Sequence, residues 1–366
     1  MPLVPPYIKS LAPYKAGKPA EELARELGLK HIVKLASNES PLGPSPKALA
    51  AAEQALKEGH RYPDPASQAL RAALADRFQV KIENVITGAG SEGIMSAIMR
   101  TFLLDDDELI SAKGSFIGFR VLADASGRTA HWVPMQDHRY DLPGLAAAIN
   151  EYTKVIYLAN PDNPTGTYFT VAEFDAFMAQ VPERVLVILD EAYFEYASER
   201  PDYPDSMHYR YDNVITLRTF SKVYGLAGLR VGYGFAHDEL IGNLLKVKLP
   251  FEPSRPAQAA ALAALEDGPH LQRAVQTNRD GMGDMQAAYQ RLDLETIPSA
   301  ANFLTLQMAT AEQASELTQA LLHRGVIVRH LTAFGWPTLV RVTIGLPEEN
   351  EYFTAQLSEV WKTIHG

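Results

Sequence analysis

The sequence predicts an α/β fold in which helices cover both faces of a mostly parallel sheet, with a smaller α+β domain toward the C-terminus. Three observations support this. The chain has 366 residues, a length typical of about two domains. From about residue 85, strand-sized apolar runs without alternation are separated by helical segments, which indicates buried parallel strands. Beyond residue 254, a long helical region gives way to a mixed pattern of helices and strands.

The expected elements divide the chain into three parts. Residues 19–29 have the spacing of a helix and residues 32–35 that of a short strand, while the Pro, Gly, Ser and Asn residues at 36–46 are typical of a loop. Two helices follow, and Ser67 is the expected N-cap of the second. We expect an N-terminal arm that also forms part of the small domain at 1–45, a large domain at 46–254 and a small domain at 255–366.

A glycine turn follows the first strand of the large domain. The strand at 85–87 leads into GAGSEG at 88–93, which opens a helix at 92–104. This order of elements directs free backbone N–H groups at an anion, and the helix dipole adds to the attraction. The turn is not a dinucleotide-binding fingerprint, because the third glycine and the later acidic residue are not placed for one. It indicates either a phosphate site or a plain connection.

Polar residues also follow later strands, at the edge where open α/β sheets bind ligands. The strand at 154–158 is followed by NPDNPTG at 160–166, and the most apolar strand, 185–189, is followed by Asp190. A buried carboxylate is costly without a partner, so Asp190 either caps a helix or pairs with a protonated ring nitrogen. Further strands are expected at 108–111, 213–217 and 230–236, and in the small domain at 303–306, 326–329 and 339–344.

Lys222 lies where the strand at 213–217 opens into a glycine-rich loop. Burial disfavours the ammonium form of lysine, and the neutral amine can attack a carbonyl. Thr219 and Ser221 precede Lys222 and Arg230 follows it, which places two hydroxyls and a guanidinium near a potential phosphate. The segment suits a lysine that forms a Schiff base with a phosphorylated cofactor, although a surface lysine beside a turn has the same local pattern.

Two arginines stand out in the small domain. Arg341 lies in the middle of an expected strand with apolar neighbours, and Arg329 ends the strand before it. On neighbouring strands the two side chains could form a fork for a carboxylate or a phosphate, whereas arginines on an exposed edge would face water.

The composition excludes several classes of protein. The formal net charge of −10 argues against nucleic acid or an anionic membrane as the main partner, but not against anionic small molecules. The absence of cysteine excludes disulfides and thiolate chemistry. The first residues lack the pattern of a signal peptide and no apolar run is long enough to span a membrane, so we expect a cytoplasmic protein.

These candidates converge on one cofactor. A lysine for a Schiff base, an aspartate for a pyridinium nitrogen, hydroxyls and an arginine for a phosphate, and an aromatic residue for the ring each follow a strand of one sheet. This is the set of groups that a pyridoxal-phosphate site requires. We therefore expect pyridoxal 5′-phosphate, and no metal, at the ends of these strands.

Over nearly its full length the chain also resembles the fold-type I aminotransferases of class I and II, and among them most closely the histidinol-phosphate aminotransferases. The resemblance implies a three-layer sandwich like that of aspartate aminotransferase and a homodimer with shared active sites. It also implies transfer of an amino group from histidinol phosphate to 2-oxoglutarate in histidine biosynthesis. The matching stretches are LASNE at 35–39, RYPD at 61–64, GAGSE at 88–92, NPDNPTG at 160–166, DEAY at 190–193, TFSKVYGLAGLRVG at 219–232 and VRVTIG at 340–345.

The same resemblance implies roles for individual residues. Lys222 forms the Schiff base and moves a proton, and Asp190 keeps the ring nitrogen protonated. Residues that contact the cofactor ring and its phenolic oxygen are Phe119, Asn163 and Tyr193. The phosphate is held by Gly90, Ser91, Thr219, Ser221 and Arg230, and by Tyr62 from the neighbouring subunit. The substrate is bound by Arg341, with Arg329, Tyr14 and Asn38 as further candidates.

Several departures from the family pattern lie near the expected substrate pocket. Phe119 replaces a common tyrosine, Ser40 and Leu42 alter a loop that usually reads Asn-Glu-Asn-Pro-Tyr-Gly, and Gly114 replaces a usual proline. They affect the pocket and not the lysine chemistry, so two alternatives stay open: an aromatic amino-acid aminotransferase and a pyridoxal-phosphate decarboxylase of a phosphorylated amino acid. A transcriptional regulator with an aminotransferase-like domain would need an added DNA-binding module, which the acidic composition disfavours.

Overall fold

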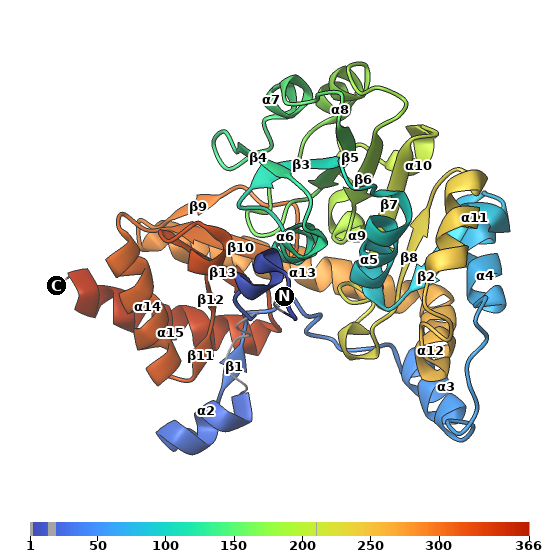
Figure 1. The fold of residues 1–366 in the computed structure, drawn as a ribbon. Coiled ribbons are helices and arrows are strands. Elements are labelled where there is room, and N and C mark those ends of the chain that lie inside the picture. The colour runs from blue at the N-terminus through green and yellow to red at the C-terminus, as the bar shows by residue number, and fades with distance from the viewer. Residues whose placement is uncertain (1–2, 14–19, 210, 366) are drawn as a thin grey trace.

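The computed structural model describes residues 3–13, 20–209 and 211–365. A large domain around a seven-stranded sheet lies beside a smaller domain (Figure 1). Helix α13 (Gly268–Arg291) joins them, because Ala274 near its start packs in the core of the large domain while Met285 and Tyr289 near its end pack in the core of the small one. The α/β class predicted from the sequence is confirmed.

The sheet of the large domain has the strand order β2-β8-β7-β6-β5-β3-β4. Neighbouring strands are parallel except for β8, which runs antiparallel to both β2 and β7. The strands are β2 (Val85–Gly88), β3 (Glu108–Lys113), β4 (Ala130–Pro134), β5 (Thr153–Ala159), β6 (Leu186–Asp190), β7 (Val214–Thr219) and β8 (Gly232–Phe235). The sequence pattern located all of these strands except β4.

Helices cover both faces of this sheet. On one face α5 (Gly90–Phe102), α6 (Ile117–Ser126) and α11 (Asp238–Val247) pack against strand side chains that include Val155 and Tyr157. On the other face α7 (Leu142–Ala147) and α8 (Val171–Met178) pack against Ile156 and Leu158. Successive side chains of a strand point to opposite faces, so both faces of β5 are buried and its sequence shows no alternation.

The small domain contains two sheets. Strands β9 (Glu295–Ile297), β10 (Phe303–Gln307), β12 (Arg329–His330) and β13 (Leu339–Thr343) form an antiparallel sheet in the order β12-β13-β10-β9. Strand β1 (Val33–Lys34) pairs in parallel with β11 (Val326–Ile327), which brings the N-terminal arm into this domain. The helices of the domain, besides the end of α13, are α2 (Ala20–Leu27), α14 (Ala311–His323) and α15 (Pro347–His365).

The remaining elements are short or lie at the β2 side of the large sheet. Helices α3 (Pro46–Leu56), α4 (Gln68–Phe78) and α12 (Arg255–Leu265) pack together there. The short elements are α1 (Pro6–Lys9), α9 (Phe194–Ala197), α10 (Ser206–Tyr209), η1 (Ile82–Asn84), η2 (Ala227–Leu229) and η3 (Thr332–Phe334). Within the described ranges, every helix is too short or too polar to cross a membrane.

Three local expectations need correction. Ser67 precedes α4 but makes no capping hydrogen bond; Asp64 Oδ2 accepts from the Gln68 N–H at 2.7 Å in its place. The expected strand at 326–329 is split between β11 and β12, which belong to different sheets. Helix α12, expected to open the small domain, packs against α3 and α4 of the large one, because its alanines fit closely into that helix layer.

Candidate active site

Polar side chains gather where three neighbouring strands of the large sheet end. Asp190 is the last residue of β6, Asn163 follows β5 and Lys222 follows β7. These strands are parallel and adjacent, so their carboxyl ends lie at one edge of the sheet. All three residues line a single cavity of about 290 Å³. The other polar or aromatic residues in its wall are Ser37, Glu39, Ser91, Glu92, Phe116, Tyr157, Tyr193, Thr219, Ser221 and Arg230.

Lys222 lies in a loop that folds back over the end of β7. Gly225 in this loop has a φ of 69° and touches the backbone of Gly43; a Cβ at Gly225 would lie 2.2 Å from Gly43 O, so a larger residue does not fit. Lys222 Nζ lies 3.5 Å from Ser37 O. Burial, followed by the positive charge of Arg341, lowers the pKa of Lys222 to about 8. A substantial fraction of neutral amine is therefore present near neutral pH.

Asp190 is 4% exposed. Its Oδ2 accepts a hydrogen bond from the Tyr157 hydroxyl at 2.9 Å, whereas its buried Oδ1 has no hydrogen-bond partner among the described residues. Burial raises the pKa of Asp190 to about 7, and the bond from Tyr157 opposes that rise. A buried carboxylate oxygen without a donor is costly, so an N–H group of a ligand in the cavity would stabilise it.

Hydrogen bonds join this cavity to the small domain. Asn38 Nδ2 donates to Tyr193 Oη at 2.8 Å, and Arg341 in β13 donates to Asn163 Oδ1 and to Ala36 O. Asn38 has a left-handed backbone with a φ of 56°, which asparagine adopts more readily than most residues. Burial raises the pKa of Tyr193 to about 12, so its hydroxyl stays protonated.

The first turn of α5 and the loop after β7 form an anion-binding corner. Thr219 Oγ1 donates to Ser221 Oγ at 3.0 Å, and Arg230 Nη1 donates to the same oxygen at 3.4 Å. A Cβ at Gly90 would lie 2.7 Å from Arg230 Nη2, so glycine is needed for the guanidinium to reach the start of α5. Ser91 lies in that first turn. Two hydroxyls and a guanidinium beside a helix N-terminus are suited to a phosphate.

The phenylalanine in the cavity wall is Phe116, whereas Phe119 does not line the cavity. Phe119 is 1% exposed, and its ring stacks on that of Tyr157 with centroids 4.2 Å apart and planes at 8°. The prediction that Phe119 stacks on the cofactor ring is therefore wrong. Helix α6 begins at Ile117, so Phe119 turns inward with the apolar face of the helix, while Phe116 precedes the helix and stays at the cavity.

Of the other predicted residues, Tyr62, Arg329 and Arg341 do not line the cavity. Tyr62 is 75% exposed, and its ring stacks on Phe251 with centroids 4.2 Å apart. Arg329 lies directly opposite Arg341 in the register of β12 and β13, but neither arginine is in the cavity wall. Arg341 donates to Oδ1 of Asn163, which is in that wall, and to Ala36 O. Tyr14 lies outside the described residues.

Sequence reasoning gave no role at the site to several residues of the cavity wall, among them Phe116, Tyr157 and Glu92. Phe116 and Phe119 are both aromatic, and only the start of α6 decides between them. Tyr157 could have been found from the period of a strand, because it is two residues before Ala159 and so shares the face on which β5 reaches the cavity. Glu92 forms an ion pair with Arg230 at 3.2 Å, which no local pattern indicates.

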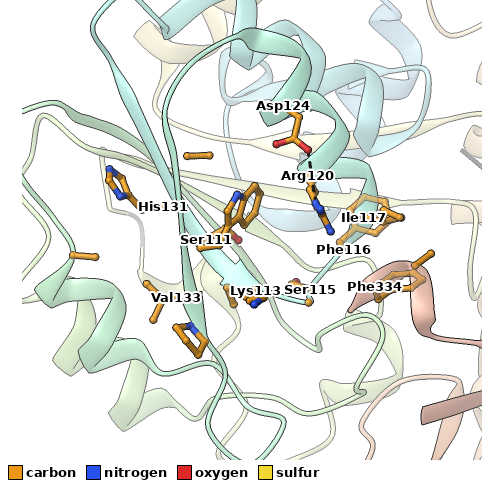
Figure 2. A pocket seen from close by; sticks show the side chains of 17 residues that line it. Ser111, Lys113, Ser115, Phe116, Ile117, Arg120, Asp124, His131, Val133 and Phe334 are labelled. Atoms are coloured by element: carbon orange, nitrogen blue, oxygen red, sulfur yellow. Dashed lines mark ion pairs between the residues drawn. The ribbon is translucent and has the colours of Figure 1, made fainter. Parts of the chain in front are cut away.

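A larger cavity of about 630 Å³ lies next to this one and shares Phe116 with it (Figure 2). Residues of strands β3 and β4, of helix α6 and Phe334 of the small domain line it. Arg120 Nε lies 3.7 Å from Asp124 Oδ2 there, and a dashed line marks this ion pair in Figure 2. Neither Lys222 nor Asp190 lines it. The smaller cavity is therefore the candidate active site, because it holds the groups with unusual pKa values.

The residues of the smaller cavity fit the cofactor expected from the sequence. Asp190 Oδ1 has no donor in the described part of the chain, Lys222 is partly neutral near pH 7 to 8, and an anion-binding corner lies beside them. Phe116 provides a flat apolar wall. A phosphorylated pyridine aldehyde needs a complement of this kind.

Comparison with known proteins agrees with this fit. Residues 30–357 match the family model described as aminotransferase class I and II. The chain is 42% identical over 363 residues to the histidinol-phosphate aminotransferase of Anaeromyxobacter sp. (strain Fw109-5), which covers 98% of this chain and 99% of that relative. It is 44% identical over 362 residues to histidinol-phosphate aminotransferase 2 of Pseudomonas fluorescens (strain Pf0-1), covering 98% and 97% of the two chains.

Solved structures show the same relationship. The crystal structure of histidinol-phosphate aminotransferase from Sinorhizobium meliloti in complex with pyridoxal-5′-phosphate matches with a TM-score of 0.91 and 31% identity, covering 100% of this chain and 99% of that chain. A single mutant of Thermus thermophilus aspartate aminotransferase, 22% identical, matches with a TM-score of 0.85 over 98% of this chain and 100% of that chain, which shows a common fold.

Proposed function

The chain belongs to the class I and II aminotransferases, and we propose that it is a pyridoxal-phosphate enzyme that transfers the amino group of histidinol phosphate to 2-oxoglutarate. The names of its relatives support this choice of amino donor. The observation that carries the chemistry is the shared cavity of Lys222 and Asp190, in which Asp190 Oδ1 has no donor among the described residues.

Lys222 and Asp190 act on two different protons of the reaction. When bound, pyridoxal phosphate supplies an aldehyde for the amino group and a ring that accepts electrons. Lys222, whose pKa is about 8, holds and releases a proton at the α-carbon of the substrate. Asp190 Oδ1 accepts the N–H of the ring and keeps that nitrogen protonated.

The remaining residues of the cavity bind and orient. Tyr193 and Asn163 would hold the phenolic oxygen of the cofactor by hydrogen bonds, and Phe116 would lie against its ring. Its phosphate is bound by Gly90, Ser91, Thr219, Ser221 and Arg230. Arg341, held against Asn163 and Ala36 O, supplies the positive charge for the carboxylate of the 2-oxo acid, and Asn38 fixes Tyr193 in place.

We also propose that the enzyme acts in the cytoplasm as a homodimer. Tyr62 and Phe251 form an exposed stacked pair on the large domain, away from the cavity of their own chain. In a dimer this pair becomes buried, and Tyr62 reaches the phosphate in the neighbouring subunit. Sedimentation analysis would test the dimer, which Phe251→Ala should weaken. The binding of the cofactor would test the shared site, because Tyr62→Ala should weaken that binding.

Amino-donor preference of the purified enzyme tests the proposed reaction. With 2-oxoglutarate as acceptor, we expect kcat/KM for glutamate formation to be at least about tenfold higher with histidinol phosphate than with phenylalanine. The control is Lys222→Ala, which should keep the fold but lose turnover and the borohydride-reducible chromophore. A preference for phenylalanine would favour the aromatic aminotransferase, release of carbon dioxide would favour the decarboxylase, and an active Lys222→Ala variant would contradict the mechanism.

A further inference from the structure

Tyr157 is the residue that contacts Asp190 through a side-chain hydrogen bond, and the sequence motifs assign it no role. From the geometry we infer that Tyr157 is a positioning residue: its hydroxyl binds Oδ2 of Asp190, keeps the carboxylate ionised and leaves Oδ1 for the ring nitrogen of the cofactor. This inference rests on the proposed function, because it concerns the same cavity.

The strand register places Tyr157 within reach of Asp190. Tyr157 lies opposite Ile188 in the parallel pair of β5 and β6, and Ala159 lies opposite Asp190. Tyr157 and Asp190 are therefore diagonal neighbours on one face of the sheet, a separation that only a long side chain can span. The tyrosine side chain spans it, and the O–O distance is 2.9 Å.

Packing fixes the direction of the tyrosine side chain. Tyr157 is fully buried, and its ring lies parallel to that of Phe119 from α6 at 4.2 Å. Trp132 packs edge-to-face against Phe119, with ring centroids 6.4 Å apart. The hydroxyl cannot turn to another acceptor without moving these rings, so the hydrogen bond to Asp190 is preorganised.

The protonation states support the direction of the bond. Burial, and then the nearby Asp190, raise the pKa of Tyr157 well above its usual range, so the phenol stays a donor at all working pH values. The other groups that act on Asp190 are the backbone N–H of Ala192 and Lys222, which favour its ionised form, and Glu92, which disfavours it. Tyr140 and Tyr193 also face Asp190, and burial raises the pKa of each, so both are neutral.

Loss of the Tyr157 hydroxyl therefore removes a donor to the carboxylate while the burial stays. The neutral form of Asp190 then persists to higher pH, because burial already raises its pKa and the opposing hydrogen bond is gone. Below the pH at which Asp190 becomes protonated, the ring nitrogen of the cofactor loses its anionic acceptor. A hydrogen bond to a charged group corresponds to a shift of about 1 to 2 pH units.

Binding of pyridoxamine 5′-phosphate to the full-length protein freed of cofactor tests this without turnover. The probe carries the ring nitrogen and phosphate but no aldehyde, so it cannot react with Lys222. Dissociation constants are measured from pH 5.5 to 9 for the wild type, for Tyr157→Phe and for Tyr233→Phe. Tyr233 is a matched control, because its hydroxyl is also buried in the large sheet but has no hydrogen-bond partner among the residues described. The protonation of the probe itself is common to all three proteins.

As the pH is lowered, the affinity for pyridoxamine 5′-phosphate should begin to fall at a pH about 1 to 2 units higher in Tyr157→Phe than in the wild type. At the acid end of the pH range this corresponds to about 10- to 100-fold weaker binding by the variant. Tyr233→Phe should follow the wild type. A probe in which carbon replaces the ring nitrogen should bind the wild type and Tyr157→Phe equally.

The outcomes separate this inference from the proposed function. Failure of the wild type to bind pyridoxamine 5′-phosphate would refute the proposed function. Binding by the wild type with the same pH profile in Tyr157→Phe, or an equal shift with the carbon probe, would overturn the role of Tyr157. If Tyr157→Phe does not fold, Phe119→Leu provides the test: it keeps the hydroxyl but loosens the ring, and a shift in the same direction supports the role while an unchanged profile overturns it.

Discussion

Replacing Asn38 would show how far the cavity depends on the contact between the two domains. Asn38 is 1% exposed, donates to Tyr193 Oη at 2.8 Å and accepts from Thr343 Oγ1 at 3.0 Å. Asn38→Gly removes both side-chain bonds but keeps the left-handed backbone. At about 0.5–1.5 kcal/mol for each bond, the variant should lose about 1–3 kcal/mol of unfolding free energy.

The comparison with Asn38→Ala isolates the free-energy contribution of the left-handed backbone at this position. Alanine loses the same two bonds and adds left-handed strain of about 1–2 kcal/mol, while glycine loses about 0.5–1 kcal/mol more conformational entropy on folding. We therefore expect Asn38→Ala to be less stable than Asn38→Gly by up to about 1.5 kcal/mol. Both variants should also bind pyridoxal phosphate more weakly, because Tyr193 is no longer held.

Equilibrium urea unfolding of the cofactor-free protein, followed by far-ultraviolet circular dichroism, measures these differences. Thr343→Val serves as the partner variant: it removes the Thr343 Oγ1 bond to Asn38 Oδ1 from the other side, and also the bond that Thr343 Oγ1 accepts from the Asn38 backbone N–H. Its effect should add incompletely to that of Asn38→Gly, because the two changes share a hydrogen bond. A wild-type unfolding midpoint for Asn38→Gly, or full additivity with Thr343→Val, would refute the reasoning.

Three further predictions concern the charges and packing around the cavity. Because burial lowers the pKa of Lys222 to about 8, its amine form dominates above that pH. The rate at which the Lys222 amine of the cofactor-free protein is labelled, followed by mass spectrometry, should therefore rise with pH with a midpoint near 8. A midpoint at the usual lysine value would contradict this. Glu92→Gln should tighten pyridoxal-phosphate binding by up to about fivefold, because the exposed ion pair with Arg230 competes with the phosphate; Glu92→Asp is the control, and weaker binding in Glu92→Gln would be the contrary result. Gly114→Ala should destabilise the protein by about 2–4 kcal/mol in urea unfolding, since the φ of Gly114 is 89° and a Cβ would lie 2.3 Å from Trp336 Nε1, which donates to Gly114 O. Adding Trp336→Phe should recover part of that loss. An unchanged unfolding free energy in Gly114→Ala would argue against the contact.

The correction of Phe119 shows where local pattern stops being informative. Phe116 and Phe119 are three residues apart at the start of a helix, and both are apolar aromatics. The resemblance to known aminotransferases suggested Phe119, but the structure places Phe119 against Tyr157 and Phe116 in the cavity wall. Which of them faces the cavity depends on the residue at which α6 begins and on the sheet beneath it.

The predicted arginine fork shows the same limit. The sequence indicated that Arg329 and Arg341 lie on neighbouring strands, and they are opposite each other in the register of β12 and β13. The direction of the Arg341 side chain, however, depends on hydrogen-bond partners far away in the chain, because Arg341 donates to Asn163 and to Ala36 O. No local rule relates positions so far apart.

By itself the sequence determined the α/β class, the positions of the buried strands of the large sheet other than β4, and the polar segments at their carboxyl ends. It could do so because burial, turns and helix starts are encoded within a few residues, and because parallel strands necessarily end at one edge of a sheet. Tertiary structure alone decided which atoms meet there: the bond from Tyr157 to Asp190, the bond from Asn38 to Tyr193 and the choice of Phe116 over Phe119. These contacts depend on side-chain directions set by strand register and domain packing, and such long-range constraints leave no periodic trace in the chain.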